Sequence, residues 1–486
     1  MAIPVMLLMT IASCTKDEKA LRVRNNVLDS KHQDRGFIII AKEGAKLEAI
    51  SENLSKLHVR NFKLRTANQQ LGLIRVQTPD PTFPEKARQI ANVESVVVDV
   101  VLNWRLPEKV FRSDKPIPPP AASAKYEIPD GDPFSYFQWD LESVKAPEAW
   151  AKGYKGKGAT VAVLDGGFLL FSEIRPNILL THSVIGGDAG MGEGFSQATH
   201  TAGIIAAPKD GFGVVGVAPE AKLMLIRVLN DDGSAPFSAV IDGIFYASNH
   251  GADVINMSFG KELPRKTYTD DNGTPDDPDD DYVVEYNRDI KDLIKAINRA
   301  TLYATLNGTT LVAAAGDGAY NYDIEKRFIT YPAAALGVLS IAANGPLGWG
   351  INQDTTLYIP AIYTNYGKQF VSYAAPGGNW SEPLNTTIVD VNGLKDPEYI
   401  FDFVLNVAFY STVLEEHPYQ YFWLTGTGVA AAHASGVIAL LYGKNPRMNP
   451  VLVERILRKS SDDYGPRGKD AFFGNGQVNA EKAVSY

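Results

Sequence analysis

The residues with the clearest chemical potential lie in four short blocks that are far apart in the sequence. Asp165 follows the apolar run Val161–Leu164 and precedes a pair of glycines, as a carboxylate at the end of a buried strand would. The other blocks are Gln197–Gly203, Leu311–Asp317 and Gly426–Gly436, which are rich in small residues. Acyl transfer needs a hydroxyl nucleophile, an imidazole base, an orienting carboxylate and donors that face the oxyanion. Of these four groups, the orienting carboxylate is the one that the blocks supply without ambiguity, as Asp165.

In order and in pattern, these blocks resemble those around the catalytic residues of the subtilisin-like serine proteases (subtilase, peptidase S8 family). The resemblance implies that Asp165 is the acid. It also implies that Gln197 stands where the family has its general-base histidine, and Gly428 where it has its nucleophilic serine. Asp317 occupies the place of the asparagine that donates to the oxyanion.

These residue types predict a loss of catalysis. The amide of Gln197 has no basic lone pair, and Gly428 has no side chain that could attack. Asp317 would place negative charge where negative charge develops, which reverses the sign of the stabilisation. In subtilisin itself, loss of the serine or the histidine alone costs about six orders of magnitude in kcat. We therefore expect a catalytically inactive homologue, a pseudoprotease.

Two alternatives remain open at this point. The chain could be an active subtilase-type endopeptidase with non-standard residues, for example with Thr425 or Thr427 as nucleophile, although no base is positioned for either by the pattern. It could also be a scaffold or assembly component of an envelope protein complex. His200 and His433 match structural histidines of the family, and we expect both to pack inside helices rather than to reach position 428.

A peptide-binding groove is better retained than the catalytic residues. Ser258, Phe259 and Gly260 resemble one of the two strands between which the family's substrates lie extended, and Gly233 lies at the other. Such a groove can bind a peptide by strand addition. Pro236 has no N–H to donate, which weakens pairing at that position. The groove could equally persist because the fold requires its strands.

We further expect Asp165 to be kept for structure. A carboxylate at the end of a parallel strand is largely buried, and an unpaired buried charge is costly. The amide of Gln197 could donate to it over about 2.7–3.2 Å.

The whole chain is an ordinary globular one. Of its 486 residues, 45% are hydrophobic and 21% are charged, and the net charge of −9 with no basic cluster argues against a nucleic-acid partner. Apolar runs of strand length alternate with segments of helix length, which predicts an α/β fold: a parallel sheet with helices on both faces. The expected strands are 159–164, 222–229, 252–258, 310–315 and 337–343.

The N-terminus resembles a bacterial lipoprotein signal. The apolar run Ala2–Ala12 is too short to span a bilayer and ends just before the single cysteine, Cys14, which would accept the lipid. No Lys or Arg precedes Cys14, in contrast to an ordinary signal peptide. The resemblance implies a signal peptide over 1–13, a polar tether over 14–35 and a lipid anchor in the outer membrane of a Gram-negative cell. The alternative is a frayed apolar N-terminus.

Three further regions follow. Residues 36–104 alternate strand and helix signals in the order of a small α+β, ferredoxin-like unit that resembles the subtilase propeptide. Residues 105–137 form a Pro-rich linker, and 138–486 resemble the subtilase domain. Within this domain, 261–308 and 378–424 look inserted.

Neither insertion demands a cofactor. The first holds an acidic run over 270–281 that lacks EF-hand spacing, so a solvated loop is favoured over a Ca²⁺ site. The second is rich in aromatic residues, which fits either an interface or additional core. These aromatics are Trp380, Tyr399, Phe401, Phe403, Phe409, Tyr410, Tyr419, Tyr421, Phe422 and Trp423.

Overall fold

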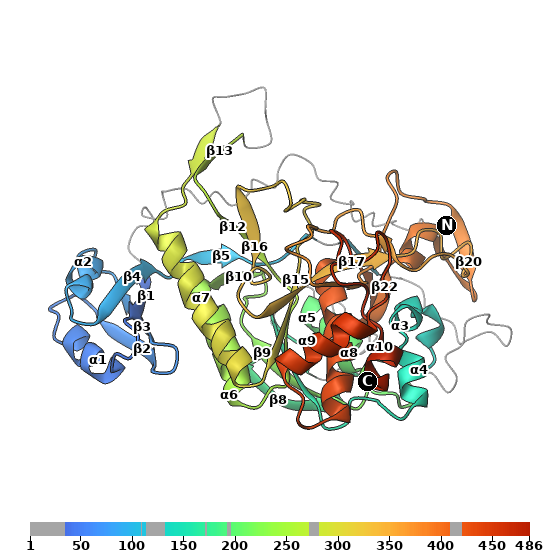
Figure 1. Cartoon of the computed structure of the whole chain (residues 1–486), viewed down its shortest axis with the longest axis horizontal. Coiled ribbons are helices and arrows are strands. Elements are labelled where there is room, and N and C mark those ends of the chain that lie inside the picture. The colour runs from blue at the N-terminus through green and yellow to red at the C-terminus, as the bar shows by residue number, and fades with distance from the viewer. Residues whose placement is uncertain are drawn as a thin grey trace, which may run out of the picture.

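A mostly parallel sheet lies at the centre of the main body (Figure 1). The computed structural model describes residues 35–107, 109–112, 132–170, 173–191, 196–271, 281–408 and 420–486. The strand order is β18-β17-β15-β11-β7-β9-β8, with β19 paired to β17, and β18 is the antiparallel member. The strands are β7 (Thr160–Asp165), β8 (Ile178–Ser183), β9 (Lys222–Arg227), β11 (Val254–Met257), β15 (Thr310–Ala314), β17 (Val338–Gly345), β18 (Ile359–Pro360) and β19 (Tyr373–Pro376). The predicted subtilisin-like α/β fold is confirmed.

Both faces of this sheet are covered by helices, and the side chains of β7 show it. Val161 and Val163 pack into the core on the side of α5 (Gln197–Ala206) and α8 (Thr427–Lys444). Ala162 and Leu164, which alternate with them along β7, pack into a second core. That core contains α6 (Phe237–Asn249) and α7 (Arg288–Leu306). A parallel strand buried on both faces is continuously apolar for this reason.

The N-terminal unit, residues 35–98, forms a separate antiparallel sheet of order β2-β3-β1-β4. Its elements are β1 (Arg35–Ala41), α1 (Leu47–Ser55), β2 (Lys63–Asn68), β3 (Leu73–Thr78), α2 (Phe83–Arg88) and β4 (Val93–Val98). The sequence pattern did not predict β2. Its six residues are exposed or half-buried and mainly polar, so no apolar alternation marks the strand.

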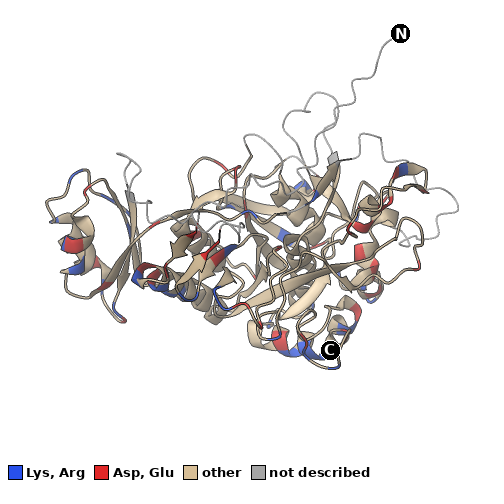
Figure 2. Ribbon diagram, turned by 90° about the horizontal axis from the view of Figure 1, so that it is seen from above, with Lys and Arg blue, Asp and Glu red and all other residues tan. Residues whose placement is uncertain are grey.

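The N-terminal unit docks on α6 and α7, beside which it lies in Figure 1. Arg75 on β3 forms an ion pair with Asp242 on α6 and lies 3.8 Å from Asp99. Glu94 on β4 pairs with Lys295 and Arg299 of α7. Figure 2 shows acidic and basic residues both on the unit and on the helices next to it. Between the charges, apolar residues of the unit join the core of α6 and α7, namely Ile38, Ile40, Leu71, Leu73 and Val97.

The aromatic insertion is mainly core. Of its described aromatics, Trp380, Phe401, Phe403, Phe422 and Trp423 are buried in the main hydrophobic cluster, and Tyr399 and Tyr421 pack against it. Phe409, Tyr410 and Tyr419 lie outside the described residues. The insertion comprises β20 (Ile388–Val391), β21 (Leu394–Pro397), the 3₁₀ helix η5 (Glu398–Asp402), β22 (Val404–Ala408) and β23 (Gln420–Leu424).

The remaining elements are short and peripheral. They are β5 (Val101–Asn103), β6 (Val110–Arg112), η2 (Ser135–Phe137), α3 (Trp139–Ser143), α4 (Ala146–Ala151), η3 (Arg175–Asn177), β10 (Ser234–Pro236), β12 (Lys261–Pro264), β13 (Tyr268–Asp270), β14 (Tyr282–Val284), β16 (Phe328–Tyr331), α9 (Pro450–Ser460) and α10 (Ala480–Ser485). Among the described residues, none of the helices combines the length and the apolar character needed to cross a membrane.

Candidate functional site

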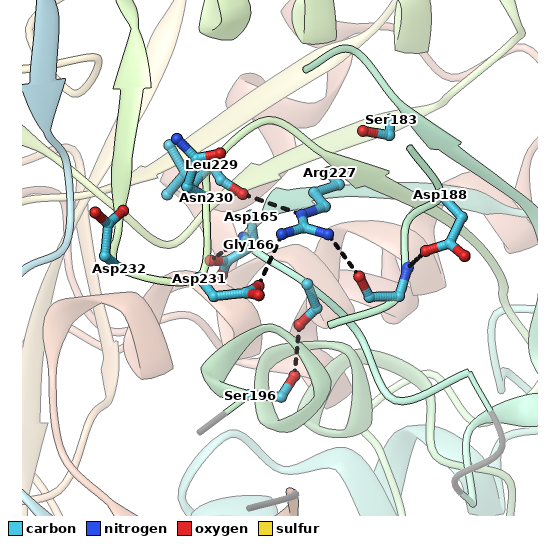
Figure 3. Close-up of polar contacts among 12 residues, drawn as sticks. Asp165, Gly166, Ser183, Asp188, Ser196, Arg227, Leu229, Asn230, Asp231 and Asp232 are labelled. Atoms are coloured by element: carbon cyan, nitrogen blue, oxygen red, sulfur yellow. Dashed lines mark hydrogen bonds and ion pairs between the residues drawn. The ribbon is translucent and has the colours of Figure 1, made fainter. Parts of the chain in front are cut away.

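Asp165 lies at the carboxyl end of β7, as expected, and is 5% exposed (Figure 3). One carboxylate oxygen, Oδ1, accepts a hydrogen bond of 2.7 Å from the backbone N–H of Gly166. The other, Oδ2, is buried and has no partner among the described residues. Burial therefore raises the pKa of Asp165 to about 6, because it disfavours the charged form.

The predicted hydrogen bond between Gln197 and Asp165 is wrong. Gln197 is the first residue of α5, but its amide is directed toward α8. Its Nε2 atom lies 3.4 Å from the point that a β-carbon on Gly428 would occupy. The preceding residue, Ser196, caps the helix by accepting from Thr199 N at 3.2 Å. The cap marks the start of α5, and the Gln197 amide beside it lies toward Gly428, so that Asp165 Oδ2 receives no hydrogen bond from it.

Gly428 is the second residue of α8 and lies in a tight place. A β-carbon there would come within 2.9 Å of the backbone oxygen of Ser258 and 3.1 Å of its β-carbon. Ser258 donates its hydroxyl to the backbone oxygen of Gly428 at 2.8 Å and accepts from Asn256 at 2.9 Å. Position 428 thus lies against Ser258, whose hydroxyl is already engaged in two hydrogen bonds.

Asp317 caps α8. Its Oδ1 accepts a hydrogen bond of 2.8 Å from Thr427 N, in the first turn of the helix. Burial raises the pKa of Asp317 to about 7, against the effect of this hydrogen bond. Because it contacts the first turn of α8, the carboxyl group lies at the positive end of the helix dipole, which favours an anion and acts against the effect of burial.

The two threonines near Gly428 serve the backbone. Thr427 accepts a hydrogen bond from Gly316 N at 2.9 Å, and Thr425 accepts one from Lys109 N at 3.2 Å. Both threonines are fully buried. These contacts assign both hydroxyls to positioning the chain.

The two histidines pack inside the core. His200 Nε2 lies 3.2 Å from the carbonyl oxygens of Val404 and Phe422, and burial lowers the pKa of His200 to about 3. His433 Nε2 contacts Asp140 Oδ2 at 2.9 Å, and its Nδ1 contacts Val429 O at 3.0 Å. As expected, both rings contact residues other than Gly428.

The chain's own segment Val101–Arg112, termed the resident segment, lies beside residues that the sequence analysis assigned to a peptide-binding groove. Its first part, β5, pairs antiparallel with β10, so that Asn103 lies opposite Ser234 and Val101 opposite Pro236. Because Pro236 has no N–H, Phe237 N supplies the next hydrogen bond, to Val100 O at 2.8 Å.

The predicted groove residues all lie close to the resident segment or to Gly428. Trp104 N donates to Gly233 O at 2.9 Å, and Gly260 N donates to Trp104 O at 2.9 Å. The Trp104 ring packs on Phe259 with a centroid separation of 5.9 Å. Gly233 adopts a φ of +81°, which a side chain disfavours, and a β-carbon there would lie 2.7 Å from that of Arg105.

Further along, the resident segment contacts the residues that precede α8. Lys109 exchanges hydrogen bonds with Thr425, the residue two positions before α8 begins. Residues 110–112 then form β6, which pairs antiparallel with β23. Sequence reasoning placed residues 105–112 in the Pro-rich linker. The alternation of Trp104, Arg105 and Leu106 is the one signal that could have indicated a half-buried strand.

The predicted lipidation site and most of the acidic run remain predictions. Cys14 and residues 272–280 of the acidic run lie outside the described residues. Across the described ranges, no cluster of at least three His, Cys, Asp or Glu side chains is arranged to hold a metal ion.

The sequence is similar to those of known proteins with this architecture. Residues 156–476 match the sequence model described as the subtilase family. The chain is 28% identical to subtilisin BL of Lederbergia lenta over 347 residues, which is 71% of this chain and 98% of that protein. It is 26% identical to the minor extracellular protease Epr of Bacillus subtilis (strain 168) over 344 residues, and this match spans 41% of Epr.

Solved structures agree on the fold. Fervidolysin from Fervidobacterium pennivorans, a keratinolytic enzyme related to subtilisin, superposes with a TM-score of 0.66 at 21% identity. The match covers 94% of this chain and 62% of that one. The epidermin leader peptide processing serine protease of Staphylococcus aureus superposes with a TM-score of 0.67 at 16% identity, covering 93% of this chain and 98% of that one. With a family match that spans most of its length, the chain belongs to the subtilase family.

Proposed function

We propose that this chain is a catalytically inactive subtilase homologue, which acts by binding a polypeptide rather than by cutting one. The observation that carries the proposal is the group of side chains around the start of α8. Gln197 Nε2 faces Gly428 where a base would face a nucleophile, and Asp317 caps the helix where an oxyanion donor would stand. An amide, a missing side chain and a carboxylate cannot perform acyl transfer.

The occupied groove supports the same proposal. The resident segment pairs with β10 through its first residues and with β23 through its last ones. The backbone of this segment is thus hydrogen-bonded to Gly233 and Gly260, and further along to Thr425, which lies three positions before Gly428. What the groove retains is its ability to hold an extended chain by backbone hydrogen bonds.

We also propose that the protein acts at the cell envelope, held by a lipid on Cys14. The support is the apolar run and small residues that precede Cys14 in the sequence. Metabolic labelling with a palmitate analogue, compared between the natural chain and a Cys14→Ser variant, tests this part. Label that persists in Cys14→Ser would refute it.

A fluorophosphonate probe tests the inactivity. We expect no labelling of the pure protein under conditions in which an active subtilisin is labelled. We also expect mass spectrometry to find the N-terminal unit and the main body in one polypeptide. Spontaneous cleavage within the resident segment, without added protease, would contradict the proposal.

The second candidate function is that of an active endopeptidase. The similarity of the chain to subtilisin BL favours it. Hydrolysis of casein by the pure protein, abolished by Asp165→Ala and unchanged in Asp188→Ala, would establish this candidate. Asp188 is exposed and accepts from Gly190 N at 2.8 Å, so it is a control for removal of a carboxylate away from Asp165 (Figure 3).

A further inference from the structure

The side chains of the resident segment alternate between the groove and solvent. Trp104 is fully buried and Leu106 is 4% exposed, whereas Arg105 and Pro107 are exposed. Side chains of an extended chain point alternately to its two sides. The groove therefore receives positions 104 and 106, and position 105 faces outward along its rim.

The surroundings of the two buried side chains suit their size and apolar character. The Trp104 ring lies between Phe237 and Phe259, with centroid separations of 5.5 and 5.9 Å. Its indole Nε1 donates to Ala235 O at 3.4 Å, so the ring's one polar atom is satisfied. Leu106 lies close to Gly260, whose β-carbon position is 3.4 Å from Leu106 Cδ2. The site fits an aromatic residue followed two positions later by an aliphatic one.

The outward position meets an acidic rim formed by Asp165, Asp231 and Asp232. Figure 3 shows Arg227 paired to Asp231, at 2.9 Å, with Asp232 on the same loop. The positive charge of Arg227 can balance one of the three carboxylates of the rim. The Arg105 guanidinium donates to the backbone oxygen of Asp231 at 2.6 Å and favours the charged forms of Asp165 and Asp232. The rim therefore favours a basic side chain at the outward position.

We infer that this groove recognises an extended segment with the triplet aromatic–basic–aliphatic, that Trp104, Arg105 and Leu106 are its resident copy, and that a second polypeptide carrying the same triplet takes its place. The inference rests on the proposed function, because a groove that cut its ligand would not retain it. Aromatic burial gives the affinity, and the attraction of a basic side chain to the negative charges of the rim gives the selectivity.

The resident copy has an advantage over any free peptide. It is tethered on both sides, which gives it an effective concentration on the order of millimolar. A free peptide at micromolar concentration therefore binds when the resident copy is weakened. Recognition becomes measurable in a full chain whose own triplet is altered and whose groove is natural.

The test uses a fluorescent peptide with the sequence of residues 101–112 and measures anisotropy. The receivers are the full chain with Arg105→Glu, the full chain with Trp104→Ala, and the natural chain. Arg105→Glu changes an exposed side chain and should fold normally, whereas Trp104→Ala empties a buried site. We expect the peptide to bind both variants at least tenfold more tightly than the natural chain. Peptides carrying Trp104→Ala or Arg105→Glu should bind at least tenfold more weakly than the natural peptide.

Asp232→Asn, combined with Arg105→Glu in the receiver, isolates the rim. The asparagine keeps an oxygen that can accept from Ser234 N, as Asp232 does at 2.8 Å, and removes the charge. It should weaken binding of the natural peptide severalfold and leave an Arg105→Gln peptide unchanged.

Two outcomes would overturn the inference: no binding to either altered receiver, or equal binding of natural and altered peptides. In both cases absence of fluorophosphonate labelling would leave the proposed inactivity standing. Labelling would refute the proposed function whatever the peptide does.

Discussion

The carboxylate of Asp317 lies 2.8 Å from the backbone nitrogen of Thr427, which begins α8. The four N–H groups at the start of a helix lack partners within it and favour a negative charge. In this protein the carboxyl group of Asp317 accepts one of these N–H groups, although burial raises its pKa to about 7. A reaction intermediate with its own negative oxygen next to this carboxylate would be repelled. The carboxyl group thus satisfies a helix N–H, and in its ionised form it opposes the chemistry at the same place.

Replacing Asp317 by Asn should change how stability depends on pH. Burial raises the pKa of Asp317 from 3.8 to about 7, so the folded state holds a proton that the unfolded state has released. The contribution of this group to stability is present at low pH and is lost as the pH rises to about 7. The asparagine does not titrate and can still accept from Thr427 N. We expect Asp317→Asn to raise Tm relative to the natural protein, by about 3 °C more at pH 8 than at pH 4.

The control for this cap is Asp317→Ala, which removes the acceptor as well as the charge. It should lower Tm at pH 4, because loss of a helix cap costs about 1 kcal/mol. If Asp317→Asn and the natural protein show parallel Tm curves over this range, Asp317 is charged at all these pH values and the argument from burial fails.

A serine at position 428 should fail to restore hydrolysis. Its β-carbon would lie 2.9 Å from the backbone oxygen of Ser258, so the backbone must shift to admit it. Its hydroxyl would face the Gln197 amide, which cannot take a proton. We expect Gly428→Ser to show no turnover of fluorogenic peptides and to lose about 1–3 kcal/mol of stability, the usual range for overpacking.

Gly428→Ala carries the same β-carbon without the hydroxyl and should lose a similar amount of stability. Turnover by Gly428→Ser but not by Gly428→Ala would reveal a base that the structure does not show beside position 428. The combination Gln197→His, Asp317→Asn and Gly428→Ser supplies a base, an oxyanion donor and a nucleophile together, and it is the variant in which activity is worth seeking.

Asp165 should be more dispensable than a paired carboxylate. Its Oδ2 has no partner in the described part of the chain, and burial raises its pKa to about 6. Its stabilising contribution is present below pH 4 and is lost as the pH rises through about 6. Asp165→Asn keeps an acceptor for Gly166 N and removes the charge. By chemical denaturation at pH 8, we expect it to be more stable than the natural protein by up to about 3 kcal/mol.

Asp165→Ala separates the charge from the hydrogen bond. It leaves Gly166 N without its acceptor, so it should be less stable than Asp165→Asn at every pH. A loss of stability in Asp165→Asn at pH 8 would show that the carboxylate has a partner in solution, as the sequence argument supposed.

Much of the fold could be predicted because its determinants are local. The central strands are runs of apolar residues, and β7 shows this clearly: each of Val161–Leu164 is buried, whichever face it points to. The strand β2 was missed for the opposite reason, since its residues are exposed or half-buried and carry no alternation.

In the candidate site, too, features with local determinants could be predicted and features that depend on distant residues could not. The places of Asp165, Gln197, Asp317 and Gly428 follow from the order of the sequence blocks. The direction of the Gln197 amide does not, because it depends on the distance between α5 and α8. Nor does the burial of Trp104, which is determined by Phe237 and Phe259, residues more than a hundred positions away in the sequence.

The docking of the N-terminal unit should depend strongly on Arg75. Its guanidinium pairs with Asp242 and lies 3.8 Å from Asp99, whose side chains are 15% and 5% exposed. Removing it would leave two largely buried carboxylates without their cation, and breaking a fully buried pair costs about 3–5 kcal/mol, which is the upper bound here. We expect Arg75→Ala to make the N-terminal unit unfold at a lower urea concentration than the main body, detected by hydrogen exchange in β1 and β3.

Arg65→Ala is the matched control, since Arg65 lies on the neighbouring strand, is exposed and bonds to Gln77 of the same unit. It should leave the transition unchanged to within about 0.5 kcal/mol. Adding Asp99→Asn and Asp242→Asn to Arg75→Ala removes the two stranded charges and should recover most of the loss. If the triple variant is no more stable than Arg75→Ala, the packing of the Arg75 side chain matters more than its charge, and the apolar contacts with α6 and α7 hold the unit in place.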